Sequence, residues 1–292
     1  MPWLSEEQEF TNSEMNISFS RLVHAISKSW LDYRINELNR LAVGKQAQYS
    51  KIFHQILLEG KTPKLTKEMS CNHRSKEGRD NFQFWVDCLE PGTVVEANYH
   101  SVENLIEKIR RRDITVISNT DLCRAQKMAN SVKSRPFWQT ISPESEFELK
   151  GEFVHDGVHI RIKPDIKCKP RRLLADLKVT FDVTPYGVAK RVFEGFMDVQ
   201  GAMYVKGSSE IDDVDYSKYV IIAVQDTEPY HCQEYIIPAQ LIQGAWDLVN
   251  KKIQEYKQCK MMDSWPGHSE TPMELRWPDW MMYRREEMIN EQ

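Results

Sequence analysis

The spacing of apolar residues divides the chain into a helical first part and a second part that mixes strands with helices. Between Leu22 and Tyr33, apolar residues recur at steps of three and four, which predicts a helix over 18–39. The same spacing predicts further helices over 44–60, 79–88, 101–112 and 119–133. We therefore expect residues 1–140 to form a helical N-terminal portion.

The apolar period changes to two after about residue 145. Alternating patterns predict three strands, over 147–154, 159–166 and 173–179. A helix over 187–205, strands over 218–225 and 231–237, and a helix over 238–259 are predicted to follow. This order predicts an α/β or α+β fold, with a mixed β-sheet core and its tail over 141–292. The two portions are expected to form one compact domain.

The composition is that of a soluble globular protein, with 41% apolar and 28% charged residues. The 39 basic residues are outnumbered by 43 acidic ones, which excludes nucleic-acid binding through bulk positive charge alone. No stretch is apolar for long enough to predict a membrane span, and the N-terminus lacks the apolar core of a signal peptide. The six cysteines stand singly, which is typical of reduced thiols, and we expect a cytoplasmic protein.

The segment with the clearest chemistry is Pro164-Asp165, followed ten residues later by Asp176-Leu177-Lys178. Side chains two apart on a strand point to the same side, so Asp176 and Lys178 are expected to share a face. The carboxylate can bind a hard divalent cation, and the lysine can orient an attacking water or help to deprotonate it. Asp165 can supply a second carboxylate to the same metal. Metal-assisted hydrolysis of a phosphodiester needs such a set.

Each of these features also has a purely structural interpretation. A lone D-x-K on a strand is usually a surface ion pair. A histidine such as His54, on an apolar helix, is more often a core residue than a metal ligand. Gln200 and Tyr204 share a helix face because they are four apart, and they also fit a core tyrosine beside an amide. The residues taken singly leave both interpretations open.

Several segments along nearly the whole chain occur in the order and at the spacing of a known family. They are 18–33, Gly44 through His54 to Glu59, Arg74-Ser75-Lys76-Glu77-Gly78, Ser145-Glu146, Pro164-Asp165, Asp176-Leu177-Lys178, 200–204, Glu228-Pro229-Tyr230 and 265–280. In this order they resemble the RecE-type exonucleases (exodeoxyribonuclease VIII), within the PD-(D/E)XK nuclease superfamily. The resemblance implies a mixed β-sheet core flanked by helices.

The resemblance also implies a metal site with a catalytic lysine. The implied metal ligands are His54, Asp165, Asp176 and the backbone carbonyl of Leu177. Their ion would be Mg²⁺, for which Mn²⁺ would substitute. Asp165 and Asp176 would be catalytic through this ion, and Lys178 would be the catalytic lysine.

Further site residues follow from the same resemblance. Gln200 and Tyr204 would support the site or contact the DNA backbone near the scissile phosphate, and Glu146 would be an accessory carboxylate. An iron–sulfur cluster is not expected, because related nucleases hold it with a C-terminal group of cysteines and only Cys259 lies there.

Positive charge gathers near the proposed site. Residues 150–178 include eight basic and four acidic residues, although the whole chain has a net charge of −4. Arg161 and Lys163 alternate with apolar residues and are expected to share a face with Asp165, where they would contact DNA phosphates. The loop residues Arg74 and Lys76 are further candidates for DNA binding.

These observations predict a metal-dependent exodeoxyribonuclease that degrades one strand of linear double-stranded DNA from its end. The resemblance implies 5′→3′ polarity, 3′ single strands for a single-strand annealing recombinase, a homo-oligomer, and a phage or bacterial origin. One alternative is a structure-specific or single-strand DNA endonuclease of the same fold. Another is a non-catalytic DNA-binding module.

Overall fold

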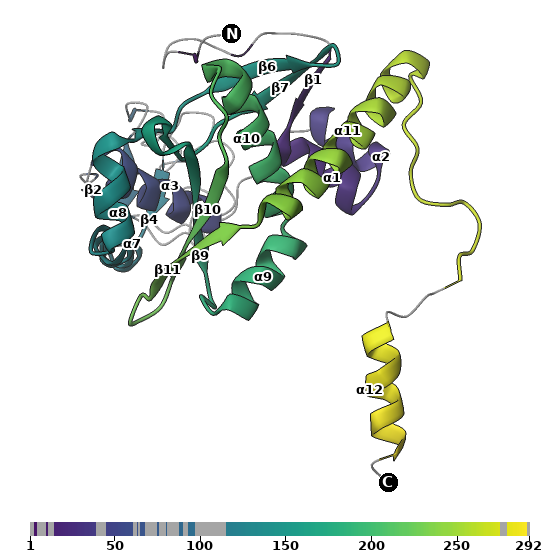
Figure 1. Ribbon diagram of the computed structural model, residues 1–292. Helices are drawn as coiled ribbons and strands as arrows, with labels where there is room; N and C mark the ends of the chain where they lie inside the picture. The colour runs from purple at the N-terminus through teal and green to yellow at the C-terminus, as the bar shows by residue number, and fades with distance from the viewer. Residues whose placement is uncertain are drawn as a thin grey trace.

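The centre of the molecule is a five-stranded mixed sheet (Figure 1). The structure is a computed structural model that describes residues 3–4, 10, 15–38, 45–60, 63, 65–67, 75, 80, 88–89, 93–96, 115–274 and 279–290. In spatial order the strands are β11 (Cys232–Ile237), β10 (Lys218–Gln225), β9 (Leu173–Thr180), β8 (Ile166–Cys168) and β5 (Glu146–Phe147). Only β9 and β10 of this sheet run parallel.

Strand β9 carries the D-x-K motif in the middle of this sheet. Asp176 lies opposite Ile221 of β10, and Lys178 lies opposite Ala223. The residues that point to the opposite face of β9 are Leu173, Ala175, Leu177 and Val179, and all four belong to one hydrophobic core. The predicted alternation along this strand is therefore confirmed.

Two smaller sheets accompany the central one. The first contains β1 (Asn16–Ser18), β7 (Val158–Ile162) and β6 (Gly151–His155), and β1 pairs in parallel with β7. The second contains β2 (Leu65–Lys67), β3 (Val94–Glu96) and β4 (Thr115–Ile117), all parallel. The N-terminal portion thus holds strands as well as helices. Strands β1, β2, β3 and β4 have three residues each, too few to show an apolar period of two.

Two hydrophobic cores lie on the two faces of the central sheet. The first contains residues of α1 (Phe19–Ser27), α2 (Trp30–Leu38), α9 (Pro185–Glu194), α10 (Met197–Asp212) and α11 (Ala239–Met262). The second contains residues of α3 (Lys45–Leu58), α7 (Asn119–Lys133) and α8 (Pro136–Ile141). Short 3₁₀ turns, η2 (Ser142–Glu144) and η3 (Lys169–Arg171), precede β5 and β9.

Local sequence signals explain several element boundaries. The predicted helix over 119–133 coincides with α7, which begins where Ser118 accepts a hydrogen bond from the N–H of Asp121. The predicted helix over 187–205 is in fact two helices, α9 and α10, because Phe196 between them adopts a left-handed conformation (φ 52°). An α-helix cannot continue through such a residue.

The other sequence predictions differ in detail. The helix predicted over 18–39 is also divided, into α1 and α2. The helices predicted over 79–88 and 101–112 lie almost wholly outside the described residues. The tail holds a further helix, α12 (Asp279–Asn290), which stands apart from the body in Figure 1 and whose described side chains are exposed. None of the helices in the described ranges combines the length and the apolar character needed to cross a bilayer.

Candidate active site

The D-x-K motif forms an ion pair on the face of β9 that the first core covers. Lys178 Nζ contacts the Asp176 carboxylate, whose side chain is only 1% exposed. Burial acts to lower the pKa of Lys178, but the charges of Asp176 and Asp165 outweigh it, and the net pKa is raised. Lys178 is therefore an ammonium group held beside two carboxylates.

Three further side chains meet beside this pair. His54 of α3 places Nδ1 3.0 Å from Glu148 Oε1 and 3.8 Å from Asp165 Oδ1. One potential ligand atom from each of His54, Glu148 and Asp165 lies within 4.8 Å of the other two. The second oxygen of Asp165 accepts a hydrogen bond of 2.8 Å from the N–H of Leu177, which connects this cluster to β9. One imidazole nitrogen and two carboxylates are a suitable donor set for a divalent cation such as Mg²⁺ or Mn²⁺.

The carboxyl groups of the cluster and of Asp176 lie close enough together to affect the pKa values of their neighbours. Burial and the nearby charge of Asp176 raise the pKa of Asp165 to about 7. Burial acts to lower the pKa of His54, but Asp165, Glu148 and Asp176 outweigh it and raise the net pKa. Closely spaced carboxylates in a buried place are unfavourable without a cation, so the arrangement fits a metal site.

The carboxylate that the structure brings beside His54 and Asp165 is that of Glu148, whereas the sequence predicted Glu146 as the accessory carboxylate. The Glu146 side chain is largely exposed and pairs with Lys167, its partner across β5 and β8, at 2.9 Å. Regular alternation would place both glutamates on one face. Glu148 departs from it because its backbone is left-handed (φ 54°) and its N–H donates to the carbonyl of Asp165 at 3.0 Å. The only feature of the sequence that could have indicated Glu148 is that it is acidic and lies two positions after Glu146.

Gln200 and Tyr204 lie on α10, close enough to Asp176 and Asp165 for these carboxylates to affect the pKa of Tyr204. Gln200 Nε2 donates a hydrogen bond of 3.0 Å to the Tyr204 hydroxyl, and both side chains are buried. Burial, together with the charges of Asp176 and Asp165, raises the pKa of Tyr204 well above its ordinary value. The hydroxyl is therefore neutral and keeps a proton that it can donate.

The predicted DNA-binding residues occupy different places. Lys163 lies at the site, where it forms an ion pair with Glu148. Arg161 does not share that position: its Nε is 3.8 Å from a carboxylate oxygen of Glu152, and its guanidinium lies over the ring of Phe10. Arg161 belongs to β7 in a separate sheet, and its side chain faces the N-terminal segment. Arg74 and Lys76 lie outside the described residues.

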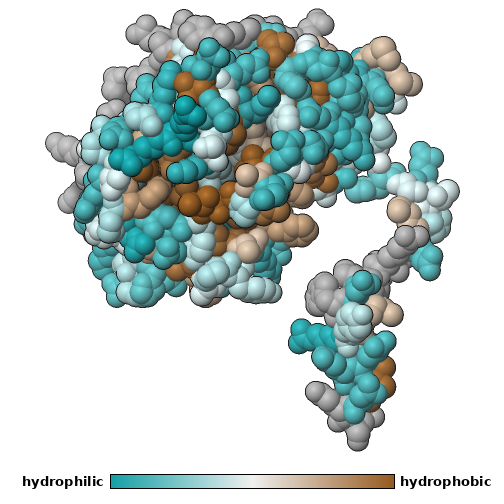
Figure 2. All heavy atoms as spheres, viewed as in Figure 1, coloured by the Kyte–Doolittle hydropathy of each residue, from teal (hydrophilic) through white to brown (hydrophobic). Residues whose placement is uncertain are grey.

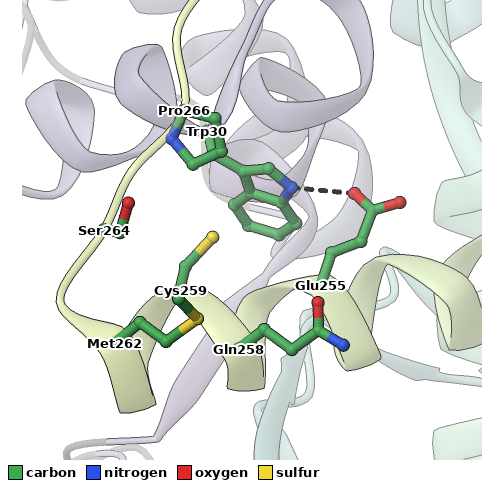
Figure 3. A pocket seen from close by; sticks show the side chains of 7 residues that line it. All are labelled: Trp30, Glu255, Gln258, Cys259, Met262, Ser264 and Pro266. Carbon is green, nitrogen blue, oxygen red and sulfur yellow. Dashed lines mark hydrogen bonds between the residues drawn. The ribbon is translucent and has the colours of Figure 1, made fainter.

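A cavity of about 300 Å³ lies elsewhere, between α2, α11 and the segment after α11 (Figure 3). Trp30, Cys259, Met262 and Pro266 line it, and Figure 3 shows the Trp30 indole donating a hydrogen bond to Glu255. None of the residues of the metal-ligand cluster or of the D-x-K pair lines this cavity.

Comparison with known proteins identifies the family. Residues 80–276 match the family model of a PDDEXK-like domain of unknown function (DUF3799), and the chain therefore belongs to this family. The match crosses residue 140, where the sequence suggested a boundary between two portions. The central sheet, the D-x-K pair on β9 and the family together place the protein in the PD-(D/E)XK class and support a nuclease.

A solved structure shares this fold. A crystal structure of a proposed exonuclease from Eubacterium rectale is 12% identical, with a TM-score of 0.57, and the similarity covers 93% of this chain and 96% of that one. At this identity the similarity concerns the fold alone. The crystal structure of SSO0001 is 10% identical over 74% of this chain and 85% of that one, and its TM-score of 0.30 carries no argument. No curated protein matches the sequence.

Proposed function

We propose that this protein is a metal-dependent nuclease that hydrolyses phosphodiester bonds of DNA. The observation that carries the proposal is the meeting of two groups of side chains where β8 and β9 lie side by side. One group is the ligand cluster of His54, Glu148 and Asp165. The other is the ion pair of Asp176 and Lys178. A ligand cluster beside a fixed ammonium group suits attack by water on a phosphate.

The cluster residues would hold the metal, and Asp176 lies close enough to affect the pKa of both His54 and Asp165. When bound there, a divalent cation would supply Lewis acidity and a water of lowered pKa. Lys178 would stabilise the negative charge that develops on the phosphate. Its raised pKa keeps it protonated, so we assign it this electrostatic role and not that of a general base. Tyr204, with Gln200 behind it, would donate a hydrogen bond to the phosphate or to the attacking water.

We further propose that the activity is that of an exonuclease on linear double-stranded DNA, with 5′→3′ polarity. The support is the resemblance of the ordered motifs to RecE-type exonucleases. By the same argument, the product would be a 3′ single strand for a single-strand annealing recombinase, and the enzyme would act as a homo-oligomer.

The proposal is tested by digesting linear duplex DNA labelled at one 5′ end, beside covalently closed circular duplex, in Mg²⁺ and in EDTA. Early release of the 5′ label from linear DNA only in Mg²⁺, with intact circles, would support the 5′→3′ exonuclease. Cleaved circles would instead indicate an endonuclease.

A parallel digestion uses Lys178→Ala, with Lys257→Ala as the matched control because that lysine forms a surface ion pair with Asp156. We expect Lys178→Ala to lose about 10²–10³-fold in rate and the control to lose nothing. Failure of the wild-type protein to cut any DNA in Mg²⁺ or Mn²⁺ would refute the nuclease proposal.

A further inference from the structure

A charged side chain is buried in the middle of β8, two positions after Asp165 of the ligand cluster. It is that of Lys167, and only 3% of it is exposed. The residues on either side of it in the strand, Ile166 and Cys168, belong to the second core, so Lys167 points to the opposite face of the sheet, toward the end of α10. A buried ammonium group is unfavourable without partners, so the groups that surround Lys167 constrain the position of β8.

Asp212 and Trp3 surround this ammonium group. Asp212, the last residue of α10, accepts a hydrogen bond of 3.0 Å from Lys167 Nζ, and its carboxylate side chain is 8% exposed. The Trp3 ring centroid lies 4.4 Å from Nζ, and the indole N–H donates a hydrogen bond of 2.8 Å to Asp212. Burial acts to raise the pKa of Asp212, but hydrogen bonds from Tyr216, Trp3 and Lys167 outweigh it and lower the net pKa. We call Trp3, Lys167 and Asp212 the lysine network.

The place of Trp3 in this network is closely fitted. A Cβ atom at Gly151 of β6 would lie 2.7 Å from the Trp3 ring, so the ring packs against a position that only glycine leaves open. The N–H of Leu4 donates a hydrogen bond of 2.9 Å to the carbonyl of Lys150, which fixes the backbone beside the ring. Trp3 lies outside residues 80–276, which the family model matches, yet it contacts a strand of the central sheet.

The backbone pairing around β8 is short. β5 has two residues and β8 has three, so few backbone hydrogen bonds fix their register. In the observed register Glu146 lies opposite Lys167, and the N–H of Glu148 donates to the carbonyl of Asp165 at 3.0 Å. A slip of β8 by one residue would turn Lys167 into the apolar second core and would move Asp165 relative to the N–H of Leu177. The buried charge therefore discriminates against the slipped register.

We propose that the lysine network positions the metal site, because it holds β8 in the register at which Asp165 and Glu148 meet. This inference rests on the proposed nuclease function and deepens it. Glu146 also pairs with Lys167, but the Glu146 side chain is 57% exposed and solvent screens the pair, so we assign the holding contacts to Asp212 and Trp3. The three residues of the network are positioning residues that act through the two carboxylates.

The experiment compares Trp3→Ala with Trp246→Ala. Both indoles are partly buried against the first core, and Trp246 packs on His155 with ring centroids 4.9 Å apart, so the two variants lose similar packing. Electron paramagnetic resonance measures the Kd of Mn²⁺. Nuclear magnetic resonance measures how fast the amide proton of Glu148 exchanges with solvent in the metal-free protein, and chemical denaturation measures the stability of each variant.

We expect Trp3→Ala to raise the Kd of Mn²⁺ about tenfold and to speed the exchange of the Glu148 amide. Lys167→Met should change both quantities in the same direction. Trp3→Phe keeps a ring over the ammonium group but loses the hydrogen bond to Asp212, so it should lie between wild type and Trp3→Ala. Trp246→Ala should lose stability and keep the wild-type Kd and exchange rate.

The inference is overturned if Trp3→Ala and Trp246→Ala have the same Kd for Mn²⁺ and the same exchange rate at Glu148, because the network would then be only structural. If the wild-type protein binds no Mn²⁺, the metal site of the proposed function fails. The exchange of the Glu148 amide then decides by itself whether the lysine network holds the register of β8.

Discussion

At the scale of single residues, Asp165 connects the cluster of His54 and Glu148 to strand β9. One of its oxygens faces His54 and the other accepts the N–H of Leu177. In this position Asp165 is buried near Asp176, and both effects raise the pKa of Asp165 to about 7. A metal site built around Asp165 should therefore depend on pH.

We expect Mn²⁺ to raise the melting temperature by several degrees at pH 8 and much less at pH 5. The folded pKa of Asp165 is above its ordinary value of 3.8, so metal-free folded protein loses stability as pH rises from about 4 to 7. A bound cation offsets this loss only where the carboxyl is ionised. At a concentration of 100 Kd, the ion would add about 2.7 kcal/mol.

Thermal melts with and without Mn²⁺ at the two pH values measure this effect. Asp165→Asn should abolish the rise at pH 8. Asp156→Asn, which changes a surface carboxylate paired with Lys257, is the matched control and should keep it. A rise of equal size in Asp165→Asn would show that the ion binds elsewhere.

Glu148 and Glu146 offer a second, sharper test of the ligand cluster. Glu148→Gln replaces an anionic carboxylate of the cluster with a neutral amide, which is a weaker donor to a divalent cation, whereas Glu146 is largely exposed and pairs with Lys167. We expect Glu148→Gln to raise the Mg²⁺ concentration for half-maximal activity about tenfold, and Glu146→Gln to leave it unchanged. Activity measured across a Mg²⁺ titration decides between them, and the opposite pattern would restore Glu146 as the accessory carboxylate.

At the scale of elements, the distance between α10 and the central sheet depends on Gly201. A Cβ atom at this position would lie 2.4 Å from the ring of Tyr219 on β10. Glycine therefore lets α10 approach the sheet closely enough to bring Gln200 and Tyr204 beneath the carboxylates. This close approach therefore contributes to the position of both side chains.

Gly201→Ala should cost about 1–3 kcal/mol of stability, because either α10 or the Tyr219 ring must shift. It should also lower kcat, since Gln200 and Tyr204 move with α10. Gly244→Ala is the matched control: Gly244 lies in α11 with nothing within 4 Å of the added Cβ, and the change should stabilise by about 0.5–1 kcal/mol. Chemical denaturation and kinetics measure both effects, and equal stabilities of the two variants would contradict the role of Gly201.

At the scale of the whole molecule, several large apolar residues are exposed on the edge strand β11, on α9 and in the loop before α9. Phe181 in the loop before α9 is 79% exposed and Ile236 on the edge strand β11 is 66% exposed, and α9 adds Tyr186 and Phe193. The Tyr235 hydroxyl donates a hydrogen bond to the carbonyl of Val183, which connects β11 to this loop. Figure 2 shows brown, hydrophobic residues near the middle of the visible face of the body.

Exposed apolar surface of this kind marks an interaction site, and the edge strand beside it lacks the Lys and Pro that discourage pairing. We therefore expect the proposed homo-oligomer to form through the edge strand β11. Ile236→Lys should shift the molar mass measured by light scattering to that of smaller species. Met261→Lys, at an exposed apolar position on the last turn of α11, should not. A wild-type protein that is monomeric at micromolar concentration would contradict this expectation.

The sequence by itself determined strand β9 and the D-x-K pair on one of its faces. The strand predicted over 159–166, in contrast, is β7 and β8, which belong to different sheets. Strand alternation is a property of the backbone, so the spacing of Asp176 and Lys178 was enough to place them on one face. The order of motifs also pointed to the PD-(D/E)XK class, to which the family match assigns the chain.

The tertiary structure alone determined which distant residues meet at the site and where the chain departs from regular helix and strand geometry. His54 reaches Glu148 and Asp165 across 94 and 111 positions of sequence only because α3 packs near the end of β8. Left-handed conformations at Glu148 and Phe196 redirected one carboxylate and divided one helix. The physical reason is that periodicity depends on neighbours in the chain, whereas a site depends on contacts between elements that are distant along it.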